Sequence, residues 1–160
     1  SKENPGIVWV EHVEFGRELS RRTGLPYYQA EGLDPAGRFI EDHPPGTPLI
    51  ASIASNHEGR NLQGWASNLV IPNPANGYMT EQLLGRTHRD GQPAEEVEAA
   101  IYLGCYEHGA AFHQARADSI RIRDTVPGAN PKLLYADTDF PDMAVIVDRD
   151  PPDQRGRWRK

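Results

Sequence analysis

The 160-residue chain has a single cysteine, Cys105, and no long run of apolar residues. One cysteine cannot form an internal disulfide, so we expect a reducing compartment rather than a disulfide-stapled secreted fold. No stretch of about 20 apolar residues occurs that could cross a bilayer, and no secretory signal is recognisable. The chain is therefore expected to act in the cytoplasm, or in the host cytoplasm if it is viral, without a membrane partner.

The signatures of several catalytic classes are also missing. No His-Glu-x-x-His pair occurs, His108 and His113 are five residues apart and do not share a helix face, and one cysteine does not support a zinc site. No Gly-x-Ser-x-Gly elbow offers a serine nucleophile, and no Gly-x-x-x-x-Gly-Lys-Ser/Thr loop offers a phosphate cradle. We therefore expect no metal site and no phosphate-binding loop of this kind.

The composition is that of one globular domain rather than of a protein that coats nucleic acid. The length falls within the roughly 100–200 residues of a single domain. The formal net charge of −6 argues against nucleic-acid binding through bulk positive charge, although it leaves room for a local basic face. The 14 prolines and 15 glycines indicate many turns.

Short apolar runs alternate along the chain with stretches of helical periodicity. The predicted strands are residues 7–10, 25–29, 49–53, 68–71 and 97–103, and the predicted helices are 12–23, 34–43, 78–87 and 107–124. This alternation predicts an α/β domain of three layers with a mostly parallel sheet and right-handed crossovers.

Three further local expectations follow from the pattern. Gly24 should cap the first helix, and Phe39 and Ile40 should face inward from the second. After Asp137 prolines and a basic end indicate a weakly structured extension, in which 143–147 could still add an edge strand.

A first candidate site lies on the predicted helix 78–87 and just beyond it. Gln82, Arg86 and Arg89 stand at i, i+4 and i+7, which places them on one stripe of a helix. Two arginines beside an amide suit a phosphate or a carboxylate, because planar guanidinium groups give directed, charge-assisted hydrogen bonds. The same spacing also fits an ordinary solvated helix face.

A second candidate site is the polar loop 55–63, which follows the predicted strand 49–53. In an open parallel sheet, loops at the carboxyl ends of strands line the binding crevice. This loop combines Gly59 with several amide side chains, as site loops do, but a plain surface connection has a similar composition.

Together the two segments resemble motifs V and VI of superfamily 2 helicases. Members of the Swi/Snf-type branch and its phage relatives typically read Gly-x-Asn-Leu-Gln, then a strand, then Gln-x-x-x-Arg-x-His-Arg-x-Gly-Gln. This chain carries the first pattern at 59–63, a predicted strand at 68–71 and the second pattern at 82–92. The run 7–10 and the helix after it resemble motif IV, so the resemblance covers most of residues 6–136.

The resemblance implies a RecA-like fold for residues 6–137, followed by the extension 138–160. Such a domain would be the second motor lobe of an ATP-dependent DNA helicase or translocase. Arg86 and Arg89 match the two motif VI arginines, which implies that they are catalytic arginine fingers acting on the γ-phosphate of ATP.

The resemblance also implies binding roles for residues outside the arginine pair. Gly59, Asn61 and Gln82 match positions that lie beside the nucleotide. Ser55 and Asn56 stand where motif V approaches the nucleic-acid backbone. The implied partners are DNA or RNA and an N-terminal RecA-like lobe, and the implied cofactors are ATP and Mg²⁺.

In the family, the Walker A loop and the acidic Mg²⁺ ligands belong to the first lobe, so the isolated chain is expected to be inactive. An alternative is a stand-alone, non-catalytic module, derived from a helicase lobe, that binds nucleic acid or protein.

The motifs also depart from the family: Glu58 replaces a small residue, and Ala75 replaces a tryptophan. Trp9 is expected in the core, whereas Trp65 could be either buried or exposed.

Overall fold

The computed structural model describes residues 6–56 and 59–135. Its strands are β1 (Gly6–Val10), β2 (Tyr27–Tyr28), β3 (Leu49–Ser52), β4 (Ser67–Ile71) and β5 (Glu98–Ile101). Its helices are α1 (Val13–Thr23), α2 (Ile53–Asn56), α3 (Gly77–Thr87), α4 (Tyr106–Thr125) and α5 (Lys132–Tyr135), with short 3-10 turns η1 (Ala30–Gly32) and η2 (Ile40–Asp42). The predicted extension 138–160, including the strand at 143–147, lies outside the described residues.

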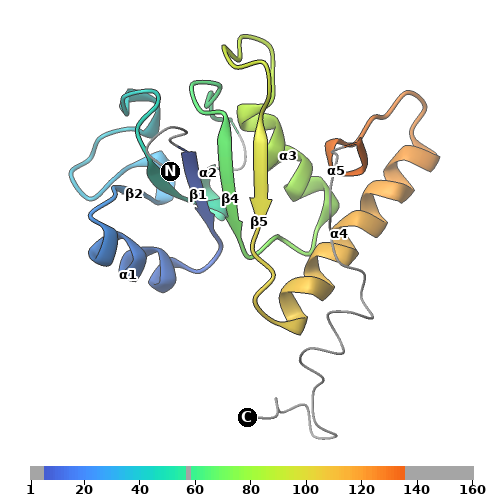
Figure 1. Cartoon of the computed structure of the whole chain (residues 1–160), viewed down its shortest axis with the longest axis horizontal. Coiled ribbons are helices and arrows are strands. Elements are labelled where there is room, and N and C mark those ends of the chain that lie inside the picture. The colour runs from blue at the N-terminus through green and yellow to red at the C-terminus, as the bar shows by residue number, and fades with distance from the viewer. Residues whose placement is uncertain (1–5, 57–58, 136–160) are drawn as a thin grey trace, which may run out of the picture.

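All five strands are parallel and form one sheet in the order β2-β3-β1-β4-β5 (Figure 1). β1 lies at the centre, where Val8 pairs with Ile50 of β3 on one side and with Leu69 of β4 on the other. β5 forms an edge of the sheet, and most of its residues are exposed. The predicted α/β class with a mostly parallel sheet is therefore confirmed.

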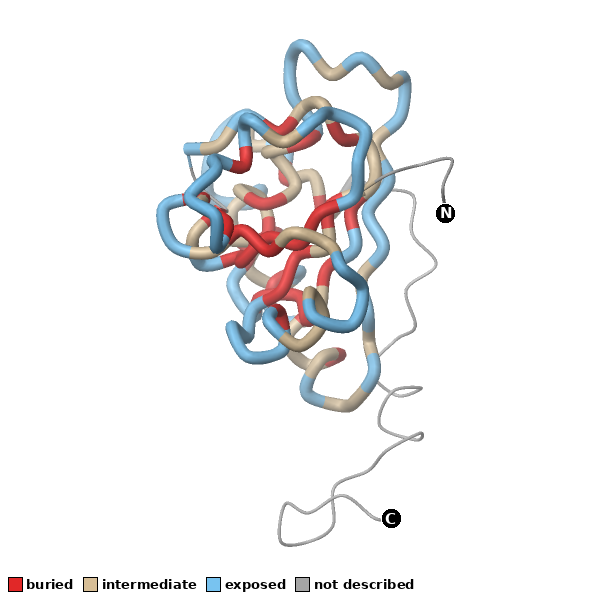
Figure 2. The backbone as a smooth tube through the Cα atoms, turned by 90° about the vertical axis from the view of Figure 1, so that its left-hand side faces the viewer, coloured by how far each residue is buried: buried red, intermediate tan, exposed pale blue. Residues whose placement is uncertain are grey.

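Successive residues of a strand point to opposite sides of the sheet, so both faces carry apolar side chains. Helices cover both of these faces. On one face, Val10, Tyr27 and Ile50 pack with Leu19 of α1. On the other face lies the main core, which includes Leu83 of α3; its buried members are Ile7, Trp9, Tyr28, Ile40, Leu49, Ala51, Ile53, Leu62, Trp65, Val70 and Leu83. Figure 2 shows that the buried residues gather in the middle of the domain, with exposed segments around them. The result is the predicted three-layer arrangement, with Trp9 and Trp65 both in the core.

The outer helix α4 packs against α3 and supports the short helix α5. Phe112 and Ala115 of α4 form a small buried cluster with Leu133 of α5. The two long helices approach closely at Gly77, where an added Cβ would lie 2.7 Å from the Ala115 carbonyl oxygen. In the described part of the chain, none of the helices is long and apolar enough to span a membrane.

Most predicted elements are present, but the predicted helix 34–43 is wrong. The carboxylate of Asp34 accepts hydrogen bonds from the backbone N–H groups of Ala36 and Arg38, and Gly37 adopts a φ of 77°. This local turn competes with a helix, because a short polar side chain satisfies the backbone donors in its place. Only η2 forms there, so Ile40 is buried as expected while Phe39 is 49% exposed.

Several element ends differ from the prediction by a few residues. The predicted strand 25–29 shortens to β2, and the predicted strand 97–103 shortens to β5. The predicted strand 49–53 ends at Ser52, because Ile53 begins α2. The C-cap of α1 is confirmed: Gly24 adopts a φ of 73° and its N–H bonds the Ser20 carbonyl oxygen.

Candidate functional site

Helix α3 is fixed at its start by a cap and along its length by the core. Asn76 is the N-cap, and its side-chain oxygen accepts a hydrogen bond from the Met79 N–H at 3.1 Å. Leu83 is buried in the main core. This orientation turns Gln82 and Arg86, one helical turn apart, away from the sheet and toward the surface.

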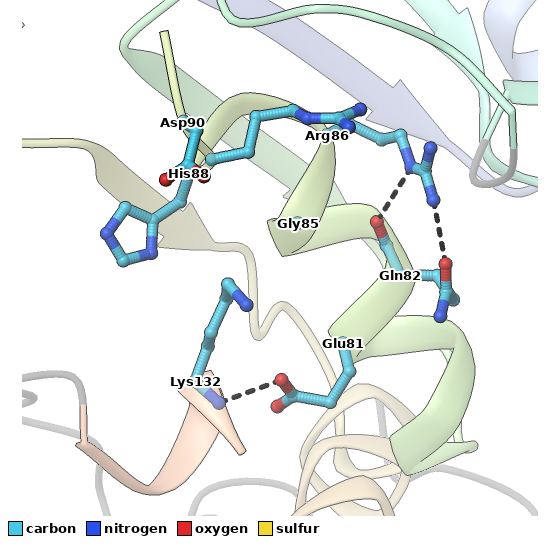
Figure 3. Close-up of a pocket in the computed structure, with 8 residues that line it drawn as sticks. Glu81, Gln82, Gly85, Arg86, His88, Asp90 and Lys132 are labelled. Carbon is cyan, nitrogen blue, oxygen red and sulfur yellow. Dashed lines mark hydrogen bonds between the residues drawn. The ribbon is translucent and has the colours of Figure 1, made fainter. Parts of the chain in front are cut away.

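The end of α3 borders an open cavity of about 580 Å³. Its lining is mostly polar and comes from α3, the turn after it and α5; the residues are Glu81, Gln82, Gly85, Arg86, His88, Arg89, Asp90 and Lys132 (Figure 3). Three of these side chains are cationic and two are carboxylates. The structure therefore brings Gln82, Arg86 and Arg89 together around one cavity that suits an anion.

Arg86 is held in place by several acceptors. Its Nη2 donates to Gln82 Oε1 at 2.7 Å, and its Nε donates to the Gln82 carbonyl oxygen at 3.1 Å (Figure 3). Its Nη1 donates to the Arg60 carbonyl oxygen at 3.2 Å. Arg86 thus joins α3 to the loop that carries the first motif, and Gln82 sets the direction of its guanidinium group.

Arg89 lies in a different environment although it is only three residues further along. Its side chain is exposed, and it makes no hydrogen bond or ion pair with the residues that the structure describes. An exposed guanidinium group without a local acceptor keeps its donors for a ligand or a partner. The two arginines therefore differ in freedom: Arg86 is fixed within the domain and Arg89 is available.

The loop with the first motif is docked onto the end of α3. The Leu62 N–H donates to the Arg86 carbonyl oxygen at 3.3 Å, so backbone and side-chain bonds meet at the same residue. Arg60 in turn forms an ion pair with Glu41 at 3.0 Å. Gly59 has a φ of 70°, a conformation that favours glycine, and both Gly59 and Asn61 are exposed beside this junction.

Ser55 and Asn56 are not part of this cavity. They lie on α2, directly after the carboxyl end of β3, and Ser55 is half-buried. Asn56 is fully buried, and its amide donates to the carbonyl oxygens of Ser52 and Tyr28 at 3.0 and 3.2 Å. In this conformation Asn56 therefore ties α2 to β2 and β3, and its side chain is buried, whereas the resemblance implied a position beside the nucleic-acid backbone. His57 and Glu58 lie outside the described residues.

The arginine end of α3 lies near the amino ends of the strands rather than the carboxyl ends. Asn68, near the start of β4, donates to Thr87 Oγ1 at 3.0 Å and accepts from Trp9 Nε1 at 3.0 Å. Because Thr87 is the last residue of α3, these bonds place the arginines beside the beginning of β4. The two arginines therefore lie near the amino end of β4, whereas the carboxyl-end rule was applied only to the 55–63 loop.

Two lining residues, Glu81 and Lys132, were not found from the sequence. Lys132 belongs to α5, far along the chain from α3, and the carboxylate of Glu81 accepts hydrogen bonds from the backbone N–H groups of Lys132 and Leu133. No motif or periodicity links these positions, because their contact depends on how α4 and α5 fold back onto α3. In the described part of the chain, no group of three or more His, Cys, Asp or Glu side chains could hold a metal ion.

Comparison with solved structures finds proteins of similar fold. The fold is similar to the C-terminal part of the Fun30 ATPase domain, with a TM-score of 0.47 and 16% sequence identity. The similarity covers 62% of this chain and 35% of that one. No protein-family model and no curated protein sequence matches the chain.

Proposed function

We propose that this domain is the second motor lobe of an ATP-dependent DNA helicase or translocase of superfamily 2. The observation that carries the proposal is the junction at Arg86, where two separate motifs are hydrogen-bonded to each other beside a cationic cavity. The five-stranded parallel sheet with helices on both faces supports it, since a RecA-like lobe has this architecture. ATP would bind between this lobe and a first lobe.

In this proposal Arg89 is the principal arginine finger. As the γ-phosphoryl group transfers to water, negative charge spreads over its oxygens, and a guanidinium group aimed at them stabilises the transition state. Arg89 is exposed at the rim of the cavity and is available for this role. Arg86, fixed by Gln82 and Arg60, would contribute its charge from a set position and couple the nucleotide to the 59–63 loop.

The remaining candidate residues have supporting roles. Gln82 orients Arg86, and Gly59 and Asn61 lie at the exposed junction where the nucleotide or the first lobe would approach. Ser55 would contact the nucleic-acid backbone from α2, with Asn56 positioning that helix from beneath. Phosphate contacts of this kind would give little sequence preference.

Mg²⁺ would accompany ATP but would be held mainly by the first lobe. In the cavity of this lobe three cationic side chains outnumber the two carboxylates, Glu81 and Asp90, and both oxygens of Glu81 already accept backbone hydrogen bonds, so the lining does not suit a divalent cation. What this chain supplies is cationic groups for the phosphates and a surface that closes over the nucleotide. ATP binding would draw the lobes together and hydrolysis would let them separate, so that repeated closure moves the lobes along DNA.

The test is the alanine substitution of Arg89 in a protein that carries this chain together with its first lobe. Arg89→Ala should reduce kcat for ATP by about 10³-fold or more, as loss of an arginine finger does. Arg89→Lys should restore little, because a point charge does not reproduce the planar fork. Melting temperature serves as the folding control.

Arg116→Ala is the matched control, since Arg116 is an exposed arginine on α4 outside the cavity. Its kcat should equal that of the wild-type enzyme. An unchanged kcat in a folded Arg89→Ala enzyme would rule out the finger role.

A further inference from the structure

We infer that Lys132 is a third cation of the cavity and contacts the phosphate chain that Arg86 and Arg89 are proposed to bind. The inference rests on the proposed function and adds to it a residue from a separate helix that belongs to neither motif. Figure 3 shows the Lys132 side chain extending from α5 into the space beside the end of α3. Lys132 lines the same cavity as both arginines.

The position of Lys132 is fixed from two sides. Glu81 of α3 accepts a hydrogen bond from the Lys132 N–H at 2.7 Å and another from the Leu133 N–H at 3.0 Å. Leu133 is buried against Phe112 and Ala115 of α4, which anchors α5 from the other side. A lysine whose backbone is held in this way loses less freedom on contacting a ligand than one on a loose loop.

The same contacts leave the lysine charge available. Both carboxylate oxygens of Glu81 are engaged by backbone N–H groups, and these bonds partly offset its negative charge. The Lys132 ammonium group makes no ion pair with any residue that the structure describes, and neither does Arg89. Lys132 and Arg89 are thus two cations that line the same cavity and form no ion pair with the described residues, and this arrangement favours an anion long enough to contact both.

The size and lining of the cavity indicate a chain of phosphates rather than a single small anion. About 580 Å³ exceeds what one phosphate group fills, and few apolar side chains line the space. Gly85 lines the cavity without adding a side chain to it, and a Cβ added there would meet nothing within 4 Å. The polyphosphate of a nucleotide has the required length and charge, with Lys132 and Arg89 contacting different oxygens.

The experiment titrates the 160-residue chain with sodium tripolyphosphate at low ionic strength and measures the affinity by calorimetry. Lys132→Gln should weaken binding by about fivefold or more, as loss of one charge-assisted contact does. Lys132→Arg should keep most of the affinity. Arg116→Gln, which removes an exposed cation outside the cavity, should leave it unchanged. Melting temperatures confirm that each variant is folded.

The variant Arg89→Ala distinguishes the inference about Lys132 from the proposed function, in which Arg89 is the arginine finger. If Arg89→Ala weakens binding and Lys132→Gln does not, the inference about Lys132 is overturned and the proposed function stands. If only Lys132→Gln weakens binding, the inference about Lys132 stands, and the finger role of Arg89 is decided by the kcat of Arg89→Ala, because a finger acts on the transition state. Absence of binding by the wild-type chain overturns the inference about Lys132 and leaves the proposed function, in which ATP binds between two lobes, to the kcat test of Arg89→Ala. A short single-stranded DNA tests the other source of phosphates: an effect of Lys132→Gln on DNA alone would overturn the assignment to a nucleotide.

Discussion

Arg86 and Arg89 show how much a residue's role depends on its surroundings rather than on its type. Both were assigned the same role from the sequence, yet Arg86 donates to Gln82 and Arg60 while Arg89 makes no such bonds with the described residues. Hydrogen bonds from a charged group to acceptors within the domain contribute to stability, whereas an exposed side chain without partners contributes little.

Arg86→Ala should therefore destabilise the domain, and Arg89→Ala should not. The expected loss for Arg86→Ala is about 1–3 kcal/mol in the free energy of unfolding, because it leaves the Arg60 carbonyl oxygen and the Gln82 side chain without a donor. For Arg89→Ala the change should stay within about 0.5 kcal/mol. Urea denaturation of both variants checks this, and equal losses would contradict the difference in environment.

His43 gives the stability of the domain a dependence on pH. Its Nδ1 lies 3.1 Å from the Tyr28 hydroxyl, its Nε2 lies 2.7 Å from Thr47 Oγ1, and its ring stacks on Trp65. Burial is the main cause that lowers the pKa of His43 below its ordinary value, and the charge of Arg38 lowers it further. The folded domain therefore holds His43 neutral at a pH where the unfolded chain already takes up a proton.

The free energy of unfolding should fall as the pH drops through the ordinary histidine pKa of about 6.5, because the unfolded state then binds more protons. The decline should continue until the pH reaches the lowered pKa of the folded state. His43→Gln removes this titration, so the variant should show a shallower fall between about pH 7.5 and pH 5.5. Urea denaturation at several pH values measures both slopes. Equal slopes would mean that His43 does not contribute.

At the scale of elements, most of the fold could be predicted because its signals are local. β1, β3 and β4 lie in short apolar runs, and the buried residues of α3 and α4 recur at helical spacing. The helix predicted at 34–43 failed because the Asp34 side chain satisfies nearby N–H groups, an outcome that hydrophobic periodicity does not reveal. The place of Lys132 could not be predicted either, since it depends on two long-range hydrogen bonds to Glu81.

The two glycines of α3 give a test of how this helix is packed. At Gly77 a Cβ would lie 2.7 Å from the Ala115 carbonyl oxygen, so Gly77→Ala should push α3 from α4 and cost about 1–3 kcal/mol. At Gly85 a Cβ would meet nothing within 4 Å, so Gly85→Ala should stabilise the domain by about 0.5–1 kcal/mol, the usual gain within a helix. Urea denaturation compares the two variants. Changes of the same sign would contradict the packing of α3 against α4.

For the whole molecule, the sequence identified the two motifs but not the geometry that joins them. Spacing along α3 correctly grouped Gln82 with Arg86, because residues four apart on a helix are neighbours. The carboxyl-end rule for parallel sheets was applied only to the 55–63 loop, and no sequence signal showed that Asn68 and Thr87 fix the arginines beside the amino end of β4. The burial of Asn56 could not be predicted from the sequence either, because it depends on hydrogen bonds to the carbonyl oxygens of Tyr28 in β2 and Ser52 in β3.

The charge of the whole chain bears on how it should bind DNA. A formal net charge of −6 opposes the approach of a polyanion, so attraction must come from local cations such as those around the cavity. Binding by the 160-residue chain alone should therefore be weak and should weaken further as salt rises. If two phosphates are contacted, the affinity should fall by about tenfold between 50 and 200 mM salt, because each contact releases counterions. Fluorescence anisotropy of a labelled single-stranded oligonucleotide across this salt range measures the slope. Tight binding that does not change with salt would show that the chain holds DNA by contacts other than phosphate pairing.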